Sequence, residues 1–64
     1  MNITPISPQD LADHMLHIHK GDHRKAYAEC LGYAKQNAGT ATGVIDGQAC
    51  ALIQKAARKA GVEI

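Results

Sequence analysis

The clearest helical pattern in the chain is ACALIQKAARKAG, which runs from Ala49 to Gly61. Asp46 is placed to cap the start of a helix here, and Gly61 is placed to end it. The pattern predicts an alanine-rich amphipathic helix over about 46–60. Its apolar residues recur at spacings of three and four and would form one stripe: they are Ala49, Leu52, Ile53, Ala56, Ala57 and Ala60.

The start of a first helix is marked by Ser7-Pro8-Gln9-Asp10. Serine can accept a hydrogen bond from a free backbone amide, proline has no amide to leave unpaired, and an acidic residue three places after the cap completes a capping box. Ile6 and Leu11 stand at the spacing of a hydrophobic staple. Lys20-Gly21 then supplies a cation and a glycine stop. These signals predict a helix over about 8–20.

The residues between these two segments predict a second helix and a connecting loop. Asp22 can cap a helix over about 22–37. Its apolar face would carry Tyr27, Cys30, Leu31 and Ala34. A turn at Gly21 would fold the first two helices together as a helical hairpin. The stretch Gly39-Thr40-Ala41-Thr42-Gly43 has no periodicity and is expected to be a loop. The predicted fold class is therefore all-α, with three short helices.

The length of 64 residues suits one small domain, which we expect to span 1–64. Ala, Leu and Ile must build most of its core, because the chain has no Phe or Trp and only two Tyr. Chains of this size commonly need a disulfide, a metal or an assembly partner to reach a useful stability. The small core therefore favours a homo-oligomer.

The cysteines and the N-terminus bear on the cellular compartment. Nothing near the N-terminus resembles an export signal, so we expect the chain to be cytoplasmic. In a reducing cytosol, Cys30 and Cys50 are expected to be free thiols that pack as small apolar residues, although one disulfide between them is the alternative. No apolar run approaches the roughly 20 residues that a membrane helix needs. A net charge of +1 argues against a strongly charged, non-specific binder.

Four histidines lie close together in the first half of the chain, which raises the question of metal binding. His14 and His17 would share one face of the first helix, and Asp10 and Asp13 each stand four residues before one of them. A structural zinc site normally has four ligands, and neither cysteine stands in a paired spacing. We therefore expect a solvated helix edge and no cofactor, with a histidine metal site as an alternative function.

Three cations form a candidate binding patch on the third helix. Lys55, Arg58 and Lys59 stand at i, i+3 and i+4, on the side opposite the apolar stripe. A helix with a basic outer face could lie in a DNA groove. The same cations also favour the helix dipole and keep the outer face hydrated. Nucleic-acid binding is therefore an alternative rather than the preferred function.

The preferred function is a small, non-enzymatic protein-binding or regulatory module that acts through its helix surfaces. No histidine is paired with a nucleophile, no glycine-rich phosphate loop is present, and so short a chain has little room for a pocket that excludes water. The profile is that of many bacterial or phage-encoded modulators. The partner is expected to be another protein, and a homo-oligomer would form through the alanine-rich stripe, at Ala49, Leu52, Ile53, Ala56 and Ala60.

Overall fold

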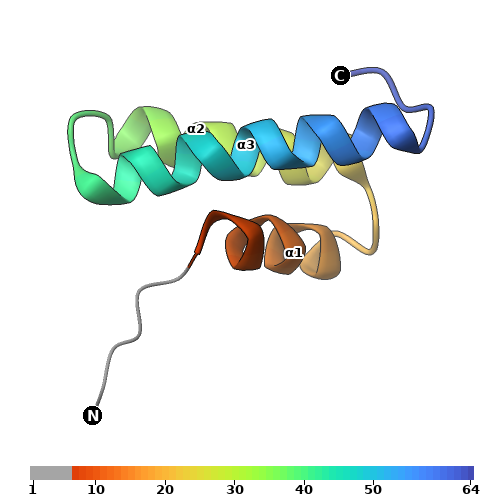
Figure 1. Cartoon of the computed structure of the whole chain (residues 1–64), viewed down its shortest axis with the longest axis horizontal. Helices are drawn as coiled ribbons and strands as arrows, with labels where there is room; N and C mark the ends of the chain where they lie inside the picture. Colours follow the sequence, from red (N-terminus) through yellow and green to blue (C-terminus); the bar gives the residue numbers. More distant parts are fainter. Residues whose placement is uncertain (1–6) are drawn as a thin grey trace, which may run out of the picture.

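The computed structural model describes residues 7–64 and has three helices. They are α1 (Pro8–Ile18), α2 (His23–Gln36) and α3 (Ala41–Lys59). Figure 1 shows α2 and α3 side by side and antiparallel, with the shorter α1 lying across the same side of both. The three-helix, all-α fold predicted from the sequence is therefore confirmed.

The start of α1 follows the predicted cap. Ser7 has extended backbone geometry, and its Oγ accepts a hydrogen bond from the amide of Asp10 at 3.1 Å. Ile6, the other partner of the proposed staple with Leu11, lies outside the described residues. The helix ends at Ile18, two residues earlier than predicted, because the chain already reverses through Lys20 and Gly21, which have φ of +55° and +82°.

The start of α3 differs from the prediction. The helix begins at Ala41 rather than near residue 46, and the predicted 39–43 loop is wrong for its second half. Thr40 is the N-cap, and its Oγ1 accepts a hydrogen bond from the amide of Gly43 at 3.0 Å. The turn between α2 and α3 is therefore short and occupies only residues 37–40.

Gly43 and Asp46 acquire structural roles from this early start of α3. A Cβ at Gly43 would collide with the backbone carbonyl of Asn37, so the turn between α2 and α3 requires glycine at this position. Asp46, the predicted cap, is instead a buried residue inside α3. Its Oδ2 accepts a hydrogen bond from Asn37 Nδ2 at 3.2 Å, which ties the end of α2 to α3.

The core lies where the three helices meet. The largest contact is between α2 and α3, so the dominant hairpin is the second pair of helices, while α1 packs against both. The largest fully buried side chains of the core are Ile53 and Cys30. Half-buried apolar residues surround it, namely Leu11, Leu16, Tyr27, Leu31, Ala34 and Leu52. None of the helices within residues 7–64 combines the length and the apolar character needed to cross a membrane.

Candidate functional site

The alanine-rich stripe of α3 packs mainly inside the chain. Ala49 and Ile53 are fully buried against α1 and α2, whereas Leu52 and Ala56 are half-buried and Ala60 is exposed. A fully buried side chain has no surface left for a second copy. The centre of the predicted oligomer interface is therefore unavailable in the folded chain, and its half-buried and exposed members remain.

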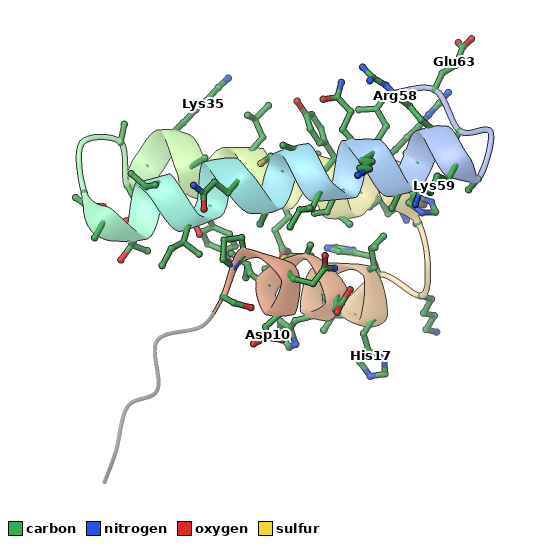
Figure 2. The ribbon with its side chains drawn as sticks, viewed as in Figure 1. Asp10, His17, Lys35, Arg58, Lys59 and Glu63 are labelled. Atoms are coloured by element: carbon green, nitrogen blue, oxygen red, sulfur yellow. The ribbon has the colours of Figure 1, made fainter. Side chains whose placement is uncertain are left out.

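The histidine cluster is divided between the outer surface of α1 and the α1–α2 turn. His14 and His17 are exposed, and Figure 2 shows His17 pointing away from α2 and α3. Asp13 accepts a hydrogen bond from Gln9 Nε2 at 2.9 Å. Within residues 7–64, neither of these histidines forms an ion pair with an acidic side chain, so neither is paired with the aspartate four residues before it.

His19 turns inward and lies beside α2. Its Nε2 is 3.4 Å from Glu29 Oε1, which links the end of α1 to the middle of α2. In the part of the chain that the structure describes, no three His, Cys, Asp or Glu side chains come together in a way that could hold a metal ion. The metal-binding alternative therefore gains no support from the geometry.

The three predicted cations of α3 are all exposed, but they point towards different neighbours. Arg58 lies on the edge that faces the C-terminal residues, and Figure 2 shows it near Glu63, with Lys59 on the other side of the helix. Lys55 and Lys59 instead line a shallow depression that also includes Gln9 of α1. The predicted patch is thus two adjoining surfaces along one helix.

An open groove lies at the end of the molecule where α2 begins and α3 ends. We call it the end groove; its volume is about 790 Å³, and its lining residues are Arg24, Gln54, Arg58, Gly61, Val62, Glu63 and Ile64. Gly61 has φ of +75°, and the amide of Val62 donates to the carbonyl of Ala57 at 2.8 Å, so the chain turns sharply after α3. Arg24 Nε donates to the carbonyl of Glu63 at 2.9 Å, which joins α2 to this C-terminal segment.

The end groove combines positive charge with apolar surface. Arg24 and Arg58 contribute two guanidinium groups to its lining. Val62 is half-buried and Ile64 is exposed, and both line the same groove. Arginine binds carboxylates in a planar, two-pronged geometry, so this lining suits an anionic group that is attached to an apolar one.

The charge around the end groove is also mostly positive. The first turn of α2 contains no acidic residue, but the Asp22 carboxylate caps its N-terminus and offsets the positive end of the helix dipole. Glu63 is the acidic side chain that lines the groove. Lys35, in contrast, lies in the last turn of α2, at the far end of the molecule in Figure 2. The other cations belong to the α1–α2 turn, the first turn of α2 and the last turns of α3: Lys20, Arg24, Lys25, Lys55, Arg58 and Lys59.

Sequence reasoning identified Arg58 as a candidate but missed Arg24, Val62 and Ile64. The signal that could have found them is the antiparallel order of α2 and α3, which brings the first turn of one helix beside the last turn of the other. Comparison with known proteins gives no further guidance: no family model matches the chain, and no curated protein or solved structure matches it significantly.

Proposed function

We propose that this chain is a non-enzymatic protein-binding module that holds an acidic, partly apolar segment of a partner protein in the end groove. The observation that carries the proposal is the pairing of Arg24 and Arg58 beside Val62 and Ile64 in one open groove. Carboxylates of the partner would bind the two guanidinium groups, while its apolar side chains would cover the two aliphatic residues.

The chemistry of the lining supports binding rather than catalysis. Arginine supplies charge and hydrogen bonds but does not exchange protons at neutral pH. The two thiols of the chain are buried in the core and do not line the groove. A cytoplasmic location, a homo-oligomer and a bacterial or phage-encoded origin remain predictions from the sequence alone.

The test is a binding titration with a short, capped peptide in which Glu alternates with Leu. We expect the Arg24→Gln, Arg58→Gln double variant to bind this peptide at least about 10-fold more weakly than the unaltered chain, because two charge-assisted contacts are lost. Lys35→Gln is the matched control, since it removes an exposed cation at the opposite end and should leave the affinity unchanged. Equal loss in both variants, or in neither, contradicts the proposed function.

Nucleic-acid binding is the second candidate, favoured by the number of cations at this end of the molecule. Lys55 and Lys59 are exposed beside the groove and could contact phosphates together with Arg58. Phosphate contacts weaken steeply as salt is added. If the triple glutamine variant of these residues keeps its helices but loses affinity for duplex DNA, with a shallower salt dependence, this function replaces the first.

A further inference from the structure

The two cysteines face each other across the seam between α2 and α3. Cys30 is fully buried and Cys50 is 6% exposed, and both are free thiols. Cys30 Sγ donates a hydrogen bond to the carbonyl of Asp46 at 3.3 Å. In an α-helix that carbonyl also accepts the amide of Cys50, so the Cys30 thiol lies against the helical turn that carries Cys50. Each thiol also shifts the pKa of the other, as expected for two side chains that lie close together.

We propose that Cys30 and Cys50 form a disulfide site, which a low-molecular-weight disulfide oxidises and which then locks α2 to α3. The inference rests on the placement of the two thiols in the core and is independent of the end groove. Disulfide formation needs close approach of the two side chains, and facing positions on neighbouring antiparallel helices provide it. The closed loop would include the whole α2–α3 turn, residues 37–40.

The environment of the thiols indicates which sulfur reacts first. Burial raises the pKa of Cys30 to about 12, with further increases from the Cys50 thiol and the nearby carboxylates. Burial also raises the pKa of Cys50, but the neighbouring Cys30 side chain acts in the opposite direction. Cys50 is in addition the less buried of the two. Cys50 is therefore the attacking sulfur, and Cys30 completes the bridge.

The reaction is a pair of thiol–disulfide exchanges. The Cys50 thiol first loses its proton to water, and its sulfur then attacks one sulfur of the oxidant. The S–S bond of the oxidant breaks, a mixed disulfide forms with Cys50, and one small thiolate leaves. Cys30 then loses its proton, and its sulfur attacks the Cys50 sulfur. The Cys30–Cys50 bond forms and the second small thiolate leaves. Both small thiolates take up a proton, so two protein thiols are oxidised as one disulfide is reduced to two thiols.

The experiment measures this equilibrium in buffers with set ratios of reduced and oxidised glutathione, with and without urea. Acid quenching followed by intact mass gives the fraction that has lost two hydrogens. If the folded chain holds the thiols in bonding position, the equilibrium constant for disulfide formation should be roughly 100-fold larger in the folded chain than in the unfolded chain. This is the effect typical of a bridge that closes a loop of this length. An equilibrium constant in the folded chain that is equal to or smaller than that of the unfolded chain overturns the inference.

Two single variants control for reactions with other partners. Cys30→Ala and Cys50→Ala keep a small apolar side chain in the core, and each should form only a mixed disulfide with glutathione. Circular dichroism of the oxidised, unaltered chain should retain the full helical signal. Loss of helix on oxidation, or a covalent dimer as the main product, shows that the two thiols do not fit an intramolecular bridge.

Discussion

Replacing Gly43 with alanine should destabilise the fold, although alanine is normally the better helix former. Gly43 lies in the first turn of α3, where the chain has just left α2. An alanine Cβ there would lie 2.8 Å from the carbonyl carbon of Asn37 and closer still to its oxygen. At Gly47, one turn further along the same helix, the corresponding Cβ position has nothing within 4 Å apart from the adjoining backbone of its own helix. The two glycines therefore form a matched pair.

The expected magnitude follows from three opposing effects. Alanine is favoured over glycine in a helix by about 1 kcal/mol, so Gly47→Ala should raise the free energy of unfolding by about that amount. At Gly43, ordinary carbon contacts of about 3.5–4 Å require a backbone shift, and overpacking of this kind costs roughly 1–3 kcal/mol. The Asn37 carbonyl also accepts bonds from the Thr40 amide and hydroxyl at 3.1 and 2.6 Å, and weakening them costs about 1 kcal/mol more. Gly43→Ala should therefore destabilise the chain by about 2 kcal/mol.

Urea unfolding followed by circular dichroism measures both variants against the unaltered chain. The predicted order of unfolding midpoints is Gly47→Ala highest, then the unaltered chain, then Gly43→Ala. A second readout is the unfolding slope, which should stay constant if only stability changes. A Gly43→Ala midpoint equal to or above that of the unaltered chain would refute the short, closely packed turn between α2 and α3.

Three further predictions concern single groups. Lys20→Gly should stabilise the chain by about 1 kcal/mol in thermal unfolding, because Lys20 has φ of +55° and glycine adopts that conformation without strain. An unchanged or lower stability of this variant would argue against the turn geometry. Asp46→Ala should cost about 1–2 kcal/mol, and a double-mutant cycle with Asn37→Ala should show that the two losses are not additive, as their 3.2 Å hydrogen bond requires. Folding raises the pKa of the Cys30 thiol from 9.0 to about 12, so the thiol of the unfolded chain ionises first as the pH rises. This thiol should therefore leave the free energy of unfolding unchanged below pH 9 and lower it between pH 9 and pH 12. Urea midpoints across this range should fall less steeply for Cys30→Ala, and identical curves would rule out this contribution.

The helices were predictable where local capping decides them. Ser7 and Asp22 accept backbone amides at the starts of α1 and α2, and Gly61 ends α3 in the left-handed conformation. The start of α3 was missed because Thr40 is followed by Thr42 and Gly43, which are poor helix formers. The helix forms there because it packs against the end of α2, a contact between segments that no local pattern reports.

The candidate site was predictable only in part for the same reason. Arg58 stands in a visible cluster of cations along α3, but Arg24 belongs to another helix and joins it only when α2 and α3 pack in antiparallel order. The sequence pattern predicts the apolar stripe as one face of a helix, but it does not show which of these residues are buried within the chain and which are free to contact a second copy. Ala49 and Ile53 are fully buried inside the chain.

The binding site of the Glu/Leu peptide can be mapped by titrating the peptide into the isotope-labelled chain and following backbone amide signals by NMR. If the peptide binds in the end groove, the largest changes will occur at Arg24, Arg58 and Val62, which line it, and none at Lys35 at the far end of α2. Changes centred on Val44 and the exposed start of α3, with the groove signals unmoved, would contradict it.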